Sequence, residues 1–421
     1  MGPMRDFFGE FSPGWRRQPG RGQSFHARFP FSQLPTRTPL TRSGSPNFLR
    51  IFAETVTIWN SQQTLGRIGN VIDTVEKLAA FLPRLRGADW VALDTEADSL
   101  HAYPEKVCLI QISIDGHDRL LDPLAGLDLD PVLDALNAHE LIMHGADYDL
   151  RLLEKHHEFI PSAIFDTMLA ARLLGERQFG LCSLAEKFLG VRLDKSSQKA
   201  DWARRPLTER MERYARADTR HLKTLADKLK AELAAKNRLA WHQESCAQLI
   251  QNCTRPQPVD GELVWRIKGS TRLSRRGLAV LRELWHWREG EAIRANRPPF
   301  FVLSHEKLVD ISAIAAVDRP IENILPLKIS PRRKKNLLDA VNKGLAVPAE
   351  SQPDILRHQF QRPTDTEFRR YRELEKIRDS RARELGIDAT LIASRATLGD
   401  LARDWDKHAP ELMNWQRELL Q

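Results

Sequence analysis

The side chains with the clearest chemical potential are carboxylates that occur where apolar residues are expected. Asp94 and Glu96 lie two positions apart in WVALDTEADSL (90–100), so on a strand both project from one face. Asp218 interrupts the apolar helical stripe of MERYARADTRHLKTLADKL (211–229). Because an unpartnered buried carboxylate is costly, these acids need compensation, which an ion pair, a hydrogen bond or a metal ion could supply.

Two further acids, Asp147 and Asp149, open a predicted helix in HGADYDL (144–150). Asp147 suits the N-cap, whereas Asp149 lies in the first turn, where it is free to project over the strand ends. Such a set of oxygen ligands suits Mg²⁺ or Mn²⁺, and two ions about 4 Å apart can stabilise the attacking and leaving oxygens of a phosphoryl displacement. The four carboxylates that we expect to meet at one edge of the sheet are Asp94, Glu96, Asp149 and Asp218.

Tyr214 lies one helical turn before Asp218 and shares its face of the helix. Its phenol, with an ordinary pKa of about 10, is too weak an acid to serve as a simple base, but it could orient an attacking water. Taken alone, a D-x-E pair is equally typical of an exposed strand edge, and Asp218 of a buried ion pair. Four acids together with a tyrosine favour metal-dependent phosphodiester chemistry.

The elements that must position these residues follow a mixed α/β pattern. Three strands joined by short loops predict an antiparallel meander, and a short apolar strand that runs into a helix predicts a βαβ-like unit. We therefore expect a mixed sheet flanked by helices. The predicted elements are helices over 71–85, 164–175 and 183–191, strands within 90–100, 106–116 and 118–124, a strand and helix over 139–156, a polar loop over 195–207, and a long helix N-capped by Thr208.

The composition narrows the class of protein and its partners. The chain has 421 residues, of which 42% are hydrophobic and 29% charged, and a formal net charge of +8, which favours an acidic partner such as nucleic acid. Its four cysteines form no C-x-x-C pair, so we expect neither a zinc cage nor a disulfide framework but a reducing, cytoplasmic location. No apolar run of about 18 residues occurs, which argues against a membrane span.

Several stretches carry a resemblance to a known family. LDTE, HGADYD and YARAD resemble the three Exo motifs of the DEDDy 3′→5′ exonucleases. CLIQIS, IFDTMLAARLL and LDKSSQKADWARRPLTERMERYARAD are similar to stretches of the ribonuclease D family in particular. The resemblance implies a ribonuclease H-like fold and a 3′→5′ exoribonuclease that removes 3′-terminal nucleotides from RNA, with tRNA precursors as the substrate class and two divalent ions as cofactor.

The resemblance also implies a role for each site residue. Asp94 would bridge both ions, Glu96 and Asp218 would hold the first, Asp149 would support the second, and the spacing of the motif selects Asp149 over Asp147. Tyr214 would position the nucleophilic water. We expect no organic cofactor and a monomer. Two alternatives stay open, a DNA 3′→5′ exonuclease, which no P-loop or polymerase region supports, and a non-catalytic RNA-binding scaffold.

Two helical segments follow the predicted exonuclease domain. Residues 264–348 contain LAVLRELWHWRE and RPPFFVLS and through them resemble an HRDC domain. Residues 356–421 look like a degenerate second copy, because RDSRARELGI echoes REGEAIRANRPPF and RATLGDLA echoes HEKLVDIS. The basic side chains that we expect to contact RNA phosphates, unless they form only a solvated basic face, are Arg275, Arg276, Arg332, Arg333, Lys334 and Lys335. The predicted domain order is a disordered basic extension (1–67), the exonuclease domain (68–251), the HRDC domain (264–348) and the second HRDC-like domain (356–421).

Overall fold

The computed structural model describes residues 70–254, 261–326, 328–356 and 363–421. The predicted N-terminal extension, residues 1–67, lies outside these ranges. In the described part of the chain, every helix is too short or too polar to cross a membrane.

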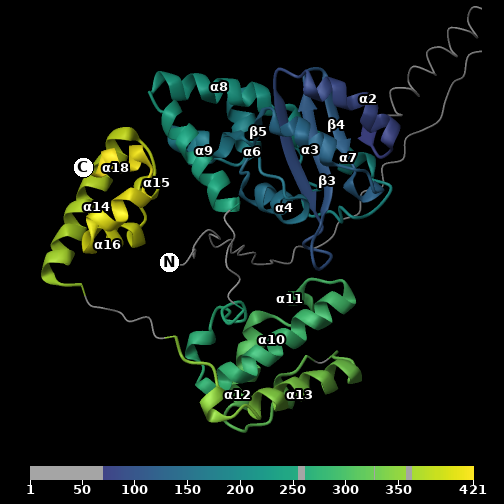
Figure 1. The fold of residues 1–421 in the computed structure, drawn as a ribbon, viewed down its shortest axis with the longest axis vertical. Coiled ribbons are helices and arrows are strands. Elements are labelled where there is room, and N and C mark those ends of the chain that lie inside the picture. The colour runs from purple at the N-terminus through teal and green to yellow at the C-terminus, as the bar shows by residue number, and fades with distance from the viewer. Residues whose placement is uncertain (1–69, 255–260, 327, 357–362) are drawn as a thin grey trace, which may run out of the picture. The chain divides into compact units, whose positions relative to one another are not determined.

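A six-stranded mixed sheet forms the centre of the predicted exonuclease domain (Figure 1). Its strand order is β1-β4-β3-β2-β5-β6. β2, β3 and β4 form the predicted antiparallel meander, while β5 pairs parallel with both β2 and β6 and β1 pairs parallel with β4. The ribonuclease H-like mixed sheet is thus confirmed. Its strands are β1 (Val71–Ile72), β2 (Val91–Ala97), β3 (Val107–Ile114), β4 (His117–Leu121), β5 (Glu140–Met143) and β6 (Ala163–Asp166).

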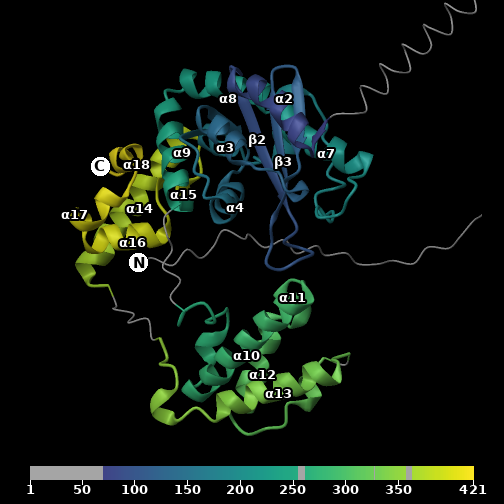
Figure 2. The same cartoon turned by 45° about the vertical axis from the view of Figure 1, so that its right-hand side comes forward.

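Helices cover both faces of this sheet because successive strand residues point to opposite sides. On one face, Leu93 and Ile112 pack in a core shared with α2, α3, α4 and α9. On the other, Ala92 and Ile142 pack with α5 and α8, and Leu109 packs with α7. The backbones of α7 and α8 can be followed in Figure 2. The helices are α2 (Val75–Arg86), α3 (Asp130–Asn137), α4 (Asp147–His157), α5 (Thr167–Leu174), α6 (Leu181–Leu184) with a π-helical turn (Ala185–Leu189), α7 (Glu209–Arg220), α8 (Leu222–Ala235) and α9 (Leu239–Thr254).

Several predicted boundaries were wrong, each for a local reason. The predicted helix 71–85 starts only at Val75, because Val71 and Ile72 pair with β4 and the Thr74 side chain accepts a hydrogen bond from the Lys77 N–H as the N-cap. The predicted helix 164–175 begins as strand β6. The long predicted helix after Thr208 is divided at His221 into α7 and α8. Thr208 itself is the N-cap that the sequence predicts.

The helices that follow residue 261 form two sets with the same internal order. In the first, Leu281 and Leu284 of α10 pack with Leu308 of α12 and Leu337 of α13. Ser304 and Ser330 are the N-caps of α12 and α13. The first set is α10 (Arg275–Ala295), α11 (Pro299–Val302), α12 (His305–Ala315) and α13 (Pro331–Leu345); the second is α14 (Asp365–Leu385), α15 (Ala389–Ile392), α16 (Arg395–Arg403), α17 (Trp405–His408) and α18 (Asn414–Leu420).

The starts of the first three helices in the two sets differ by a constant 90 residues, as in Arg275 against Asp365 and His305 against Arg395. The same spacing relates two buried arginines that pair with the following acid, Arg288 with Glu289 and Arg378 with Asp379. It also relates Ser304 and Ser394, the N-caps of α12 and α16. This agreement supports the prediction that the C-terminal set is a second copy, and the domain boundaries themselves stay a prediction.

Candidate active site

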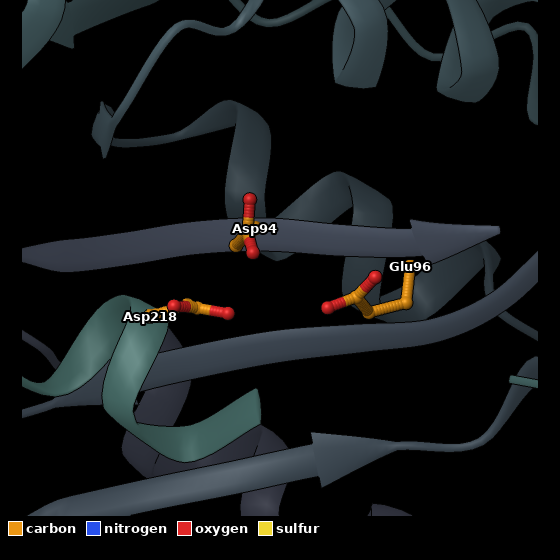
Figure 3. Close-up of side chains that lie close together, drawn as sticks. All are labelled: Asp94, Glu96 and Asp218. Atoms are coloured by element: carbon orange, nitrogen blue, oxygen red, sulfur yellow. The ribbon is translucent and has the colours of Figure 1, made fainter. Parts of the chain in front are cut away.

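Strand β2 and helix α7 bring three carboxylates together. Asp94 and Glu96 project from the same side of β2, and Asp218 reaches them from α7, which packs across β3 on that side. One oxygen from each of the three lies within 4.8 Å of the others. Figure 3 shows Glu96 and Asp218 pointing toward one another beside Asp94. The structure thus brings three of the four predicted carboxylates together, and their role as a shared site stays a prediction.

Asp149 approaches β2 from the opposite side. It lies in the first turn of α4, and its carboxylate accepts hydrogen bonds from the backbone N–H of Thr95 (3.1 Å) and from the Thr95 hydroxyl. Thr95 separates Asp94 from Glu96 and faces the other way, so it joins Asp149 to the strand that carries both acids. Asp149 lies outside the group of three, yet its charge raises the pKa of Asp94.

The predicted capping role of Asp147 was wrong. The N-cap of α4 is Ala146, and the Asp147 carboxylate instead pairs with Arg151 one turn later (3.0 Å). Asp147 is exposed, whereas Asp149 is buried. The structure thus separates the two acids of HGADYD as the motif spacing does, since Asp149 binds β2 and acts on Asp94 whereas Asp147 pairs with Arg151.

The four carboxylates share a poorly solvated space, and this raises their pKa values. Burial is the largest cause for each, and the charges of Asp218 and Asp149 add to it for Glu96, whose pKa is raised to about 9. The pKa of Asp218 is raised to about 7 and that of Asp149 to about 6. The pKa of Asp94, which is repelled by the other three acids, lies well above its usual range. Carboxylates held together at this cost form a site for cations.

Tyr214 stands beside Asp218 as predicted. Its phenol and the Asp218 carboxylate are close enough to shift each other's pKa. Burial first, and then the negative charges of Asp218, Glu96 and Asp94, raise the pKa of the phenol above its ordinary value. Tyr214 therefore stays protonated near neutral pH and can act as a hydrogen-bonding group toward a water or substrate oxygen.

A loop that precedes α7 fixes the position of Tyr214. The buried Trp202 packs its ring 5.9 Å from that of Tyr214, measured between centroids. Arg205 binds the buried Asp122 through two nitrogens, Nε (2.5 Å) and Nη2 (2.7 Å), and donates to the Trp202 and Cys108 carbonyls. The stretch DWARRPL thus ties the start of α7 to the sheet. No role was predicted for these residues from the sequence, although a tryptophan and an arginine within a polar loop indicate contacts with the rest of the domain.

Asp166 is a second positioning residue that the sequence analysis missed. Its buried carboxylate accepts hydrogen bonds from four backbone N–H groups, those of Gly145 (3.1 Å), Ala146 (2.8 Å), Met168 (2.7 Å) and Leu169 (3.1 Å). Two of these donors begin α5 and the other two lead into α4. One side chain therefore holds the turn from which α4 presents Asp149.

The donor set fits divalent metal ions. Three acids with oxygens within 4.8 Å offer hard ligands of the type that Mg²⁺ and Mn²⁺ prefer, and Asp149 adds a fourth from across the strand. Among the described residues, no lysine or arginine forms an ion pair with any of the four, and the neighbouring charges that act on Asp94 are all negative. A divalent ion would supply the positive charge that this arrangement needs.

The predicted RNA-contacting side chains lie on α10 and α13, apart from the carboxylate site in the sequence. Five of the six form ion pairs with acids of their own helical segment. The buried Glu291 carboxylate binds both Arg332 (2.9 Å) and Arg333 (3.2 Å). The other pairs are Arg275 with Asp354, Arg276 with Asp318 and Lys335 with Asp339, and Lys334 lies beside Lys335 on α13. These contacts give the arginines partners within the protein, and RNA binding by the six residues stays a prediction.

Comparisons with known proteins agree with this geometry. A family model described as a 3′-5′ exonuclease matches residues 70–234, which contain all four acids and Tyr214. A second model, described as an HRDC domain, matches residues 277–318. The two matches fall on the two regions that the sequence analysis assigned to these classes.

Curated relatives extend the similarity over most of the chain. Ribonuclease D from Gluconacetobacter diazotrophicus is 31% identical over 359 residues, which cover 83% of this chain and 90% of the relative. Ribonuclease D from Zymomonas mobilis is 32% identical over 354 residues, covering 81% and 89%. The crystal structure of Escherichia coli RNase D, described as an exoribonuclease involved in structured RNA processing, superposes with a TM-score of 0.66 at 27% identity and covers 83% of this chain and 96% of that one.

Proposed function

Because the chain belongs to the ribonuclease D family and is a 3′→5′ exoribonuclease, we propose that its four carboxylates hold two divalent metal ions for hydrolysis at RNA 3′ ends. The observation that supports this most strongly is the meeting of Asp94, Glu96 and Asp218 within 4.8 Å. Ions bound there would stabilise the negative charge that develops on the scissile phosphate.

In this proposal each side chain has one task. Asp94, the acid repelled by all three others, would help to hold both ions, while Glu96 and Asp218 would hold the first and Asp149 would support the second. Tyr214, which packs against Trp202 and lies beside Asp218, would orient the attacking water through its hydroxyl. The product of each cycle is a 5′-mononucleotide and an RNA shortened by one residue.

The test is hydrolysis of 3′-labelled RNA with Mg²⁺ or Mn²⁺. We expect mononucleotide release by the wild-type protein and none by Asp94→Ala or Asp218→Asn. RNA binding by Asp218→Asn should persist, because the predicted RNA-contacting residues lie on other helices. Full activity of Asp94→Ala, or loss of RNA binding in Asp218→Asn, would contradict the assignment. Calorimetric titration with Mn²⁺ gives the number of ions directly.

The natural substrate is the finer part of the proposal. We propose tRNA precursors as the substrate, because structured RNA is what the Escherichia coli relative is described as processing. We also propose that the protein acts as a monomer in the cytoplasm. Rates on a tRNA precursor, an unstructured RNA and a DNA strand of equal length separate these substrates. A faster reaction on DNA would favour the DNA exonuclease that the sequence analysis kept as an alternative.

We also propose that the basic side chains of α10 and α13 contact the RNA backbone. Arg332 keeps 59% of its side chain exposed although it binds Glu291, and Lys335 keeps 77% exposed, so both can still reach phosphates. Neutralising Lys334 and Lys335 together should reduce the slope of log affinity against log salt by about 2, since each lost phosphate contact removes about 1. An unchanged slope would leave these residues with only a stabilising role.

A further inference from the structure

Gln111 is a buried amide in the middle of β3 whose polar atoms have no partner. Its side chain is fully buried, and neither Nε2 nor Oε1 makes a hydrogen bond to any residue that the structure describes. Buried polar groups are almost always paired, because leaving a donor or acceptor unsatisfied is costly. An unpaired primary amide at a fully buried position therefore points to a partner that binds there.

The strand register places this amide beside the carboxylate site. Gln111 pairs directly with Asp94 of β2 and, on its other side, with Leu120 of β4. Directly opposed residues of antiparallel strands point to the same face with Cβ atoms about 5 Å apart. The amide of Gln111 and the carboxylate of Asp94 therefore lie on the face that α7 covers.

Helix α7 closes over this position from both sides. Two residues before Gln111 on β3, Leu109 packs in one cluster with Met211 and Ala215 of α7. Two residues after it, the Ser113 hydroxyl lies 2.8 Å from the Thr219 hydroxyl of α7. The neighbouring side chains on this face of β3 therefore carry no unsatisfied polar atom, because Leu109 is apolar and Ser113 is hydrogen-bonded. Gln111 alone on this face of β3 carries unsatisfied polar atoms, and it is the residue opposite Asp94.

We propose that Gln111 is a positioning residue for Asp94 and that its Nε2–H group donates to the Asp94 carboxylate when divalent ions are bound. Because directly opposed residues have Cβ atoms about 5 Å apart, a rotation of the Gln111 side chain would bring its amide to the Asp94 carboxylate. An amide suits the position because it donates a hydrogen bond without adding a fifth negative charge. The bond would fix which oxygens of Asp94 face the ions, and this inference rests on the proposed metal site.

The first test is Gln111→Met, which keeps the length and removes the polar atoms. We expect Mn²⁺ affinity and kcat to fall about tenfold to a hundredfold, as is typical when a residue that supports a metal ligand is lost, with KM for RNA little changed. Thermal stability in EDTA should be equal to or higher than that of the wild type, because an unpaired buried amide has been removed. Wild-type Mn²⁺ affinity and kcat in this variant would overturn the proposal.

The matched control is Ser113→Ala, on the same strand and face. Ser113 is equally buried, but it binds Asp118 and Thr219, so its loss should lower thermal stability and leave Mn²⁺ affinity unchanged. If Ser113→Ala weakened Mn²⁺ binding as much as Gln111→Met, the effect would be one of general packing and the proposal would fail.

A second measurement needs no substitution and so does not depend on the folding of a variant. In protein labelled with ¹⁵N at glutamine, Mg²⁺ should shift the side-chain NH₂ resonance of Gln111, the pair expected to exchange most slowly with solvent. An unshifted resonance at saturating Mg²⁺ would overturn the proposal. Failure of the wild-type protein to bind Mg²⁺ or Mn²⁺ at all would instead contradict the proposed function, so the two outcomes are distinct.

Discussion

Replacing Asp166 by Asn tests whether a buried carboxylate outside the metal site controls it. Oδ1 of Asp166 accepts from Gly145, Met168 and Leu169, and Oδ2 accepts from Ala146. An asparagine can place its carbonyl at the Oδ1 position, but its NH₂ group then faces the N–H of Ala146. The variant therefore keeps three weakened bonds and leaves one buried donor unsatisfied.

The size of the effect follows from that count. A buried N–H without an acceptor costs about 2 kcal/mol, and loss of the negative charge weakens the three remaining bonds by about 1 kcal/mol in total. We expect Asp166→Asn to lower the free energy of unfolding by about 3 kcal/mol. Because Gly145 and Ala146 lead into α4, Asp149 should also shift, and a displacement of about 1 Å can cost about a hundredfold in kcat.

Urea unfolding followed by fluorescence measures the first effect and single-nucleotide release from labelled RNA the second. The matched control is Asp388→Asn, an exposed N-cap whose Oδ1 accepts from Thr390, and asparagine caps helices nearly as well as aspartate. Its effect should be below about 0.5 kcal/mol, with kcat unchanged. An Asp166→Asn protein with wild-type stability and kcat would refute the reasoning about Asp166.

Three further predictions concern other parts of the chain. Tyr214→Phe should lower kcat about a hundredfold while calorimetry shows unchanged Mn²⁺ binding, because only the water-orienting hydroxyl is lost; wild-type kcat would exclude that role. The pKa of Glu96 is raised from 4.5 to about 9. In EDTA the fold should therefore lose stability as the pH rises from about 4.5 toward 9, because Glu96 loses its proton more readily in the unfolded chain. Scanning fluorimetry should show a thermal midpoint that falls over this range and falls less in Glu96→Gln; parallel curves would contradict the assignment. Gly344→Ala should destabilise the packing of α10 with α13 by about 2 kcal/mol, because its Cβ would lie 2.5 Å from the Cα of Val280. The control is Gly290→Ala, whose Cβ would meet only the Arg294 guanidinium, at 3.9 Å. This variant should not lower the thermal midpoint.

Periodicity predicted the residues that act within one element. The two-residue period of a strand placed Asp94 and Glu96 on one side of β2, and the helical period placed Tyr214 and Asp218 on one side of α7. The mixed sheet followed from the order of strands and helices. Asp149 was selected over Asp147 by motif spacing, since periodicity alone allowed either.

Residues that act between elements were not predicted, because their roles depend on contacts between distant parts of the chain. Asp166 binds a turn 20 residues earlier, and Arg205 reaches Asp122 across 83 residues. Thr95 was visible in LDTE only as the residue between two acids. The predicted helix over 71–85 failed for the same reason, because Val71 and Ile72 are strand only through their pairing with β4.

The alternation along β2 makes the site dependent on strand pairing. Asp94 and Glu96 face α7, while Thr95 between them faces α4 and binds Asp149. A slip of one residue in the pairing of β2 with β3 would turn both acids into the apolar core under α4 and bring Thr95 to the other side. Such a chain could retain much of its secondary structure and yet have no nuclease activity. Turnover per molecule is therefore a more sensitive measure of native refolding than circular dichroism.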